Sequence, residues 1–296
     1  GETARLKEAQ ATWLSRLRLP PGGALLIQAV AGSGKSDLAE RWLGAAMLRD
    51  ENWRYICFNN SLATKMRERL PLGVRMVTTM NDLAIEALKK KRLIAQEEYR
   101  TGSVFKDSIA ALAEDRGWAE GLDGVVVDEA VDISNELFEA LKKNAPPQCR
   151  WLILFDSDQK IQGDPSEEEL HWLDQHFNHA VRFEQRENFH SPKKVVEEIN
   201  RLHLAKKRVI PCNTYVGEQP KYFLYPEGDE ERMLEHTEAA IREWQEVSVP
   251  PREMALITFR GRENSQLLKQ QCIGEVQLKK PTDRYNEYGE QQYTDG

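Results

Sequence analysis

The run AGSGKS joins an apolar stretch at residues 24–30 to an amphipathic stretch that begins at Asp37. The first stretch predicts a buried strand, and the second predicts a helix. Small residues at such a junction allow a tight turn whose backbone N–H groups face an anion, and the helix directs its positive dipole end toward the same point. The run therefore predicts a phosphate-binding loop, with a Gly/Ser turn before a capped helix as the alternative. Its members are Ala31, Gly32, Ser33, Gly34, Lys35 and Ser36.

Two side chains in this loop have the chemistry that a nucleoside triphosphate requires. Lys35 would reach the β and γ phosphates, and the Ser36 hydroxyl would bind Mg²⁺. The strict pattern has a glycine where this chain has Ala29. With that one departure, the loop still predicts a triphosphate bound together with magnesium.

Composition limits the class of protein. At 296 residues the chain is long enough for two domains of ordinary size. An apolar fraction of 40% and a charged fraction of 30% are typical of a globular protein with a charged surface. No segment approaches the ~20 apolar residues of a membrane span, and the first residues have no signal-peptide core. We therefore expect no membrane partner and a cytoplasmic location.

Charge and cysteine spacing are less decisive. The net charge of −7 argues against a broadly basic protein that coats nucleic acid, but a few clustered lysines and arginines are enough for a local groove. Residues 89–92 read KKKR in a helical pattern, where phosphate contacts or a solvated helix face would account for them. The four cysteines are far apart and have neither zinc-site nor disulfide spacing.

Apolar runs and helical patterns alternate through the first two thirds of the chain. This rhythm predicts an α/β fold with a largely parallel sheet. The expected strands lie at residues 24–30, 54–59, 74–79, 124–128, 151–156 and 180–184, and the expected helices at about residues 37–48, 62–70 and 134–143. The charged stretch at residues 81–120 has a helical pattern without a strand, which predicts a helical insertion on the sheet.

After Pro192 the rhythm restarts. The expected elements are a helix to residue 203, a strand at residues 222–225, a helix at residues 231–247 and a strand at residues 255–259. These elements predict a second α/β unit, which is incomplete because too few strands follow. We therefore expect a first domain at residues 1–185 and a partial second domain at residues 186–296.

Two adjacent carboxylates, Asp128 and Glu129, end the apolar run that begins at Val125. Hydrolysis of a nucleoside triphosphate needs one carboxylate to hold Mg²⁺ at the end of a strand and a second one to polarise the attacking water. We assign the first task to Asp128 and the second to Glu129. A solvated turn is the alternative for such a pair, and the upstream phosphate loop favours the catalytic interpretation.

Another apolar strand, expected at residues 151–156, is followed by the polar run Ser157, Asp158 and Gln159. An amide at the end of such a strand can bond a terminal phosphate and report its hydrolysis to neighbouring segments. We therefore expect Gln159 to contact the nucleotide, with a polar turn as the alternative.

These motifs occur in the order seen in one family. They comprise Gln10, the loop at residues 31–36, FNN at residues 58–60 with MRER at residues 66–69, TTMN at residues 78–81, DEAVD at residues 128–132, DSDQ at residues 156–159 and ENFHSP at residues 187–192. From about Leu6 to Phe259 the chain resembles the UvrD/Rep-like superfamily 1 DNA helicases. Single motifs of this kind are common, whereas seven in this order are specific.

The resemblance implies two RecA-like domains of the P-loop NTPase class, with ATP and Mg²⁺ held between them to drive movement along single-stranded DNA. It also implies protein partners in DNA repair or defence. The residues that it assigns to the nucleotide and metal are Gln10 on adenine, Ala31 to Ser36 on the phosphates, Ser36 and Asp128 on Mg²⁺, Glu129 on the water, Gln159 on the γ-phosphate and position 190 beside the transferring phosphoryl. Those on the DNA strand are Asn59, Asn60, Thr79 and Asn81, the last in place of a family histidine.

Three departures from the family's pattern bear on activity. Val131 replaces a glutamine that links the nucleotide to the DNA side, Gln162 replaces a base-stacking aromatic, and His190 replaces an arginine that stabilises the transferring phosphoryl. Base stacking is worth ~1–3 kcal/mol per base and an arginine finger ~10³–10⁵ in rate, so both DNA binding and turnover would be weaker. Arg186 and Arg260 are candidate substitutes for the missing arginine.

Two classes of function follow. The first is an ATP-hydrolysing DNA helicase or translocase motor core, and the second is a nucleotide-binding switch or scaffold that has lost motor activity. An RNA-directed or defence-associated relative is a further alternative, because nothing in the sequence reads a 2′-hydroxyl. The sequence ends at residue 296 without the family's later motifs, which leaves a fragment of a longer protein and a naturally shortened relative as open alternatives.

Overall fold

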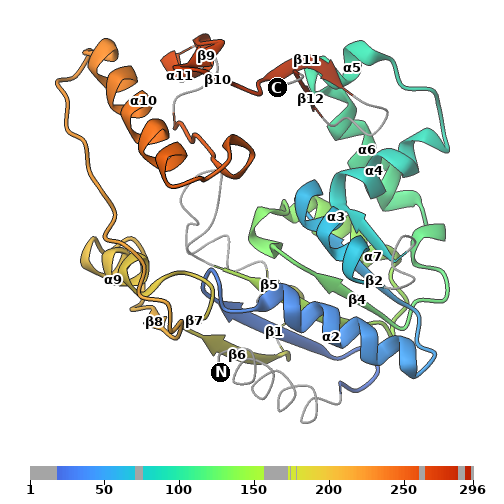
Figure 1. The fold of residues 1–296 in the computed structure, drawn as a ribbon. Coiled ribbons are helices and arrows are strands. Elements are labelled where there is room, and N and C mark those ends of the chain that lie inside the picture. Colours follow the sequence, from blue (N-terminus) through green and yellow to red (C-terminus); the bar gives the residue numbers. More distant parts are fainter. Residues whose placement is uncertain are drawn as a thin grey trace. The chain divides into compact units, whose positions relative to one another are not determined.

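The computed structural model describes residues 19–70, 76–156, 173, 175–177, 179–259, 264–285 and 291–294. The chain divides into two compact units, Gly1–Pro220 and Lys221–Gly296. Each unit has its own set of helices and strands (Figure 1). The domain boundary expected after residue 185 stays a prediction.

A six-stranded sheet forms the centre of the first unit, in the order β3-β2-β4-β5-β1-β6. Every pairing within it is parallel. The strands are β1 (Ala24–Ala29), β2 (Trp53–Cys57), β3 (Val77–Thr79), β4 (Gly124–Val127), β5 (Arg150–Phe155) and β6 (Val181–Gln185). The six strands predicted from the apolar runs are thus confirmed, and so is the α/β fold of the P-loop NTPase type.

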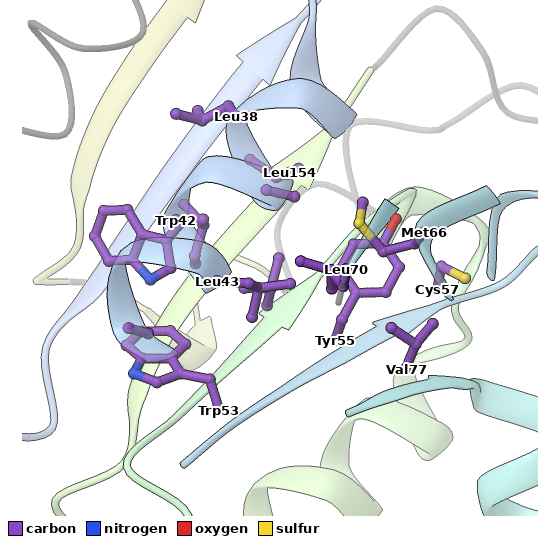
Figure 2. Close-up of a cluster of buried hydrophobic side chains, with 14 of the residues drawn as sticks. Leu38, Trp42, Leu43, Trp53, Tyr55, Cys57, Met66, Leu70, Val77 and Leu154 are labelled. Carbon is purple, nitrogen blue, oxygen red and sulfur yellow. The ribbon is translucent and has the colours of Figure 1, made fainter. Parts of the chain in front are cut away.

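Two helices pack against one face of this sheet through a cluster of buried apolar side chains. Because side chains alternate along a strand, each strand supplies residues to both faces. Ile27 of β1 and Tyr55 of β2 belong to the cluster that packs against α2 (Lys35–Leu48) and α3 (Asn60–Arg69). Figure 2 shows the side chains of this cluster between the strands and α2. Both helices confirm the ones predicted after the first two strands.

The opposite face of the sheet is covered by α7 (Asn135–Asn144). Phe138 of this helix lies against Trp151 of β5, with ring centroids 5.9 Å apart. α7 confirms the helix predicted at residues 134–143. Since helices pack on both faces, the central strands β1, β4 and β5 are buried and mostly apolar on both sides.

The predicted helical insertion is confirmed as a series of helices after β3. It consists of α4 (Met80–Lys89), α5 (Gln96–Thr101), α6 (Ser103–Glu114) and the 3-10 turn η2 (Gly117–Ala119). Three members of its basic cluster pair with carboxylates inside the insertion. The pairs are Lys90 with Asp115, Lys91 with Glu114 and Arg92 with Glu98. These ion pairs favour a solvated helix face over phosphate contact for this cluster.

A smaller pair of strands follows the sheet within the first unit. β7 (Glu187–Asn188) runs parallel to β8 (Ile210–Pro211), and α9 (Lys193–Arg201) connects them. The helix predicted after Pro192 is thereby confirmed. A 3-10 turn, η3 (Ala130–Asp132), follows β4.

The second unit is built on α10 (Glu230–Glu246), which confirms the helix predicted at residues 231–247. Its other described elements are η4 (Pro251–Glu253), α11 (Gln266–Lys269) and two antiparallel ribbons, β9 (Cys272–Ile273) with β10 (Val276–Gln277) and β11 (Pro281–Tyr285) with β12 (Gln291–Tyr293).

The strands predicted at residues 222–225 and 255–259 are wrong, because neither segment pairs with a strand in the part of the chain that the structure describes. Apolar side chains of these segments face solvent instead: Leu224 is 91% exposed and Ile257 is 79% exposed. The described residues of the second unit therefore form no parallel sheet. No helix in the described parts of the chain is long and apolar enough to span a bilayer.

Candidate phosphate-binding site

The predicted loop connects the end of β1 to the start of α2. Gly32 and Gly34 have φ angles of 68° and 89°, in the left-handed region that glycine adopts most readily. Gly34 is also the N-cap of α2, where it makes no side-chain cap hydrogen bond. The turn therefore presents a helix N-terminus without a side-chain cap, which is the geometry of an anion site.

A cavity of about 280 Å³ lies against this loop. The loop residues, Asp128, Glu129 and His190 line it together. α3 adds Lys65 and Arg69, two basic residues that no sequence motif had assigned to the nucleotide. Their spacing of four residues, which puts them on one face of the helix, is the signal that could have identified them.

The Asp128 carboxylate is buried and accepts hydrogen bonds from three groups. Its Oδ2 accepts from the Tyr55 hydroxyl at 2.7 Å and from the Ser36 hydroxyl at 3.3 Å, and its Oδ1 accepts from the Glu129 N–H at 2.9 Å. Burial raises the pKa of this carboxyl, and the donors together with Lys35 oppose the rise. Ser36 and Asp128, the two predicted metal ligands, therefore lie side by side.

The Lys35 ammonium belongs to the same cavity. Its Nζ donates to the carbonyl oxygens of Ala29 at 2.6 Å and Val30 at 3.1 Å, and it lies 4.0 Å from Asp156 Oδ2. Burial lowers the pKa of Lys35, whereas the charges of Asp156 and the two cavity carboxylates oppose this. A cation held partly by neutral carbonyl groups can exchange those bonds for charge-assisted bonds to phosphate oxygens.

Glu129 is held in an unusual conformation between β4 and η3. Its φ of 55° and ψ of 43° lie in the left-handed region, which is rare for a residue with a side chain. Burial and the negative charges of Asp128 and Asp132 raise the pKa of its carboxyl to about 7. A carboxyl with such a pKa can accept a proton near neutral pH, as a general base does.

Asn188 ties the segment after β6 to the phosphate loop. Its buried side chain donates from Nδ2 to the Ala31 carbonyl oxygen at 2.8 Å, and its Oδ1 accepts from the N–H groups of His190 at 3.1 Å and Ser191 at 2.7 Å. These bonds keep His190 at the cavity, at the position where the family resemblance predicts a cation. No sequence motif had given Asn188 a role.

The donors of the cavity fit a phosphate group bound with Mg²⁺. Ser33 Oγ is buried and has no hydrogen-bond partner in the part of the chain that the structure describes, so this hydroxyl is available to a ligand. The described residues contain no group of three or more His, Cys, Asp or Glu side chains that could hold a metal. A metal here would therefore share its oxygen ligands between Ser36, Asp128 and the phosphates, as Mg²⁺ commonly does.

Some predicted residues fall outside the part of the chain that the structure describes, and one described residue does not line the cavity. Gln10 and Gln159 lie outside the described residues, as do Gln162 and Arg260. Arg186 is described, but its Nε lies 3.7 Å from a carboxylate oxygen of the β6 residue Glu184, and it is not among the residues that line the cavity. His190 is therefore the one residue of its motif that the structure brings to the cavity, among those it describes.

The predicted DNA contacts lie at the carboxyl ends of β2 and β3, which are neighbours in the sheet. Asn59 and Asn60 are exposed, and Asn81 is half-buried. Thr79 differs, because it is 1% exposed and its hydroxyl accepts a hydrogen bond from an N–H group at the start of α4. Asn59 also caps a helix, since its side chain accepts from two N–H groups at the start of α3.

Comparison with known proteins agrees with the fold. Residues 20–165 match the protein family described as AAA domain. No match was found among curated proteins. One similar solved structure is titled a DNA replication initiation factor; it is 17% identical, with a TM-score of 0.33, over 70% of this chain and 54% of that one. Another is the Pif1 helicase from Candida albicans, which is 12% identical, with a TM-score of 0.39, over 81% of this chain and 54% of that one.

The chain spans about half the length of both solved structures. The AAA-domain match is more informative, because it includes both the phosphate loop and the adjacent carboxylates Asp128 and Glu129. Together with the parallel sheet, it identifies residues 20–165 as a fold of the P-loop NTPase type.

Proposed function

We propose that this chain is an ATP-hydrolysing motor core of the UvrD/Rep-like superfamily 1 type, which moves on single-stranded DNA. The observation that carries the proposal is the meeting of the phosphate loop, Asp128 and Glu129 at one cavity. A binding module needs only the loop, whereas a hydrolase also needs a metal-binding carboxylate and a base. The geometry of this cavity supports both a metal-binding carboxylate, Asp128, and a base, Glu129.

Each side chain at the cavity has a task in this proposal. When nucleotide binds, Lys35 exchanges its hydrogen bonds to the carbonyl groups of Ala29 and Val30 for bonds to the terminal phosphates. Ser36 and Asp128 hold Mg²⁺, which would neutralise phosphate charge when bound. The carboxylate that follows Asp128 orients the attacking water and accepts its proton.

Further nucleotide contacts belong to the same proposal. Arg69 and His190 line the cavity and would contact phosphate oxygens. Gln10 would contact adenine, and Gln159 the γ-phosphate, as the resemblance implies.

We place the DNA strand along the carboxyl ends of β2 and β3. Asn59, Asn60 and Asn81 would contact it, and Thr79 would support them through the cap of α4. A first RecA-like domain at residues 1–185 and a partial second one at residues 186–296 belong to the proposal. Partners in DNA repair or defence and a cytoplasmic location are part of it as well.

A nucleotide-binding switch without motor activity is the second candidate. His190 favours it, because this side chain lines the cavity where the family resemblance predicts an arginine beside the transferring phosphoryl. The full chain is assayed for ATP binding, and for ATP hydrolysis with single-stranded DNA, with single-stranded RNA and without nucleic acid. Hydrolysis that DNA strongly stimulates supports the motor, whereas ATP binding with negligible hydrolysis supports the switch. Hydrolysis that is stimulated by RNA and not by DNA would show that the motor acts on RNA.

ATP hydrolysis is expected to depend on the ionisation of Glu129. Because burial and the neighbouring carboxylates raise its pKa to about 7, the carboxyl is protonated at lower pH and cannot accept a proton from water. We expect kcat/KM to fall about tenfold for each pH unit below about 7 and to level off above it. The profile is measured from about pH 5.5 to about pH 9. A midpoint near the ordinary glutamate value would contradict this assignment.

Replacing Gly32 with alanine is expected to loosen the phosphate loop. The added Cβ would lie 2.8 Å from Asn188 Nδ2, and a side chain is strained at a φ of +68°. Asn188 would then have to move away from the Ala31 carbonyl oxygen. We expect the free energy of unfolding to fall by about 1–3 kcal/mol, measured by chemical denaturation, and ATP binding to weaken in a titration.

Gly44→Ala is the matched control for this loop substitution. Gly44 lies inside α2, and no atom lies within 4 Å of a Cβ added there. Alanine in a helix interior is expected to stabilise the protein by about 0.5–1 kcal/mol and to leave ATP binding unchanged. Equal effects of the two substitutions would contradict a specific role for the Gly32 turn.

A further inference from the structure

Tyr55 brings a hydroxyl group from the apolar core to the buried carboxylate of the cavity. The residue is fully buried on β2 and belongs to the cluster shown in Figure 2. Its hydroxyl donates to Asp128 Oδ2 at 2.7 Å. An apolar side chain of similar size would serve if packing were the only requirement at this position. The hydroxyl therefore points to a role at the carboxylate.

Of the three donors to this carboxylate, Tyr55 is the one that lies outside the loop and turn around the ligand. Ser36 belongs to the phosphate loop, and its hydroxyl, 3.3 Å from Oδ2, would turn toward Mg²⁺ when the metal binds. The Glu129 N–H belongs to the same turn as Asp128 and moves with it. The tyrosine hydroxyl can therefore hold Oδ2 in place while the other groups change partners.

The backbone keeps Tyr55 in register with the carboxylate. β2 pairs with β4 so that Tyr55 lies beside Val126 and Ile56 lies beside Val127. The Asp128 N–H then donates to the Ile56 carbonyl oxygen at 2.9 Å. Because the strands are paired and the ring is enclosed by the core, the hydroxyl has little freedom to leave Asp128.

We propose that Tyr55 is a positioning residue, which orients the Asp128 carboxylate toward the Mg²⁺ of a bound nucleotide. The proposal rests on the proposed function, because it requires a metal-bound nucleotide in this cavity. Without the hydroxyl, the carboxylate can rotate away from Ser36, while Lys35 still meets the phosphates. The defect should therefore lie in the dependence on Mg²⁺ rather than in nucleotide binding as such.

Tyr55→Phe removes this hydroxyl and keeps the ring in the core. Binding of a fluorescent ATP analogue to the full chain is titrated with and without Mg²⁺. Without Mg²⁺ we expect the affinity to stay within about twofold of wild type, and we expect the Mg²⁺ concentration for half-maximal binding to rise about tenfold, as for loss of a hydrogen bond to a charged group. The matched control, Tyr99→Phe, alters another buried tyrosine, in α5, and should leave the Mg²⁺ dependence unchanged.

The outcomes of this experiment separate two failures. Unchanged Mg²⁺ dependence in the Tyr55→Phe variant, with wild type that binds the analogue in a Mg²⁺-dependent manner, overturns the role of Tyr55 alone. A loss of affinity that is equal with and without Mg²⁺ overturns it too, because a general effect on the fold would explain that loss. Wild type that shows no Mg²⁺-dependent binding overturns the proposed function, and the role of Tyr55 with it.

Discussion

Replacing Lys35 with alanine is expected to weaken ATP binding by about 100-fold or more and to abolish hydrolysis. Truncation of a buried charge that meets an opposite charge typically costs about 2–5 kcal/mol. The Lys35 ammonium is in such a place, since it is largely enclosed and lies near Asp156 and the two carbonyl groups at the end of β1. Titration with a fluorescent ATP analogue measures the affinity, and phosphate release measures the hydrolysis.

Lys206→Ala is the control for this charge removal, because Lys206 is exposed and is not among the residues that line the cavity. It should bind and hydrolyse ATP as wild type does. Circular dichroism of both variants checks that each is folded. Hydrolysis retained by the folded Lys35→Ala variant would show that the loop is not the phosphate site.

Glu129→Gln is expected to spare ATP binding and to reduce hydrolysis by about 10²–10⁴-fold, the usual contribution of a general base. The amide keeps the size of the side chain but cannot accept the proton of the attacking water. Single-turnover hydrolysis measures the chemical step, and the exposed α7 residue Glu136, replaced in the same way, is the control. Wild-type rates in the Glu129→Gln variant would rule out this residue as the base.

The same substitution is expected to stabilise the fold at neutral and higher pH. The pKa of Glu129 is raised from 4.5 to about 7 in the folded protein, so the folded state binds this proton more tightly than the unfolded chain does. Ionisation therefore destabilises the folded state increasingly as pH rises from about 4.5 to about 7, by about 1–3 kcal/mol in all. Denaturation at about pH 5 and about pH 8 should show the larger gain for the Glu129→Gln variant at the higher pH. A gain that does not depend on pH would contradict a raised pKa.

The first unit could be predicted from the sequence because its signals are local and agree with one another. The apolar run before Asp128 predicts a buried strand from its local composition alone. The loop before α2 contains the glycines that its turn requires. Parallel strands have their carboxyl ends at one edge of a sheet, which is why the phosphate loop after β1 and the carboxylates after β4 meet there. The structure brings them to one cavity.

Other features depend on contacts between distant residues and could not be predicted. Tyr55 in an apolar strand is typical of a packing residue, and only the fold brings its hydroxyl to Asp128. Asn188 likewise gains a role only where the fold brings it to Ala31. The strands expected at residues 222–225 and 255–259 failed for a related reason, since apolar composition favours a strand only where a neighbouring strand is present to pair with it.

The rate of ATP hydrolysis by the full chain, with and without single-stranded DNA, is the most direct test that this cavity drives a motor. We predict Mg²⁺-dependent hydrolysis that DNA stimulates and that Lys35→Ala and Glu129→Gln each remove. Hydrolysis that persists in both variants, or ATP binding without hydrolysis under either condition, would contradict that claim.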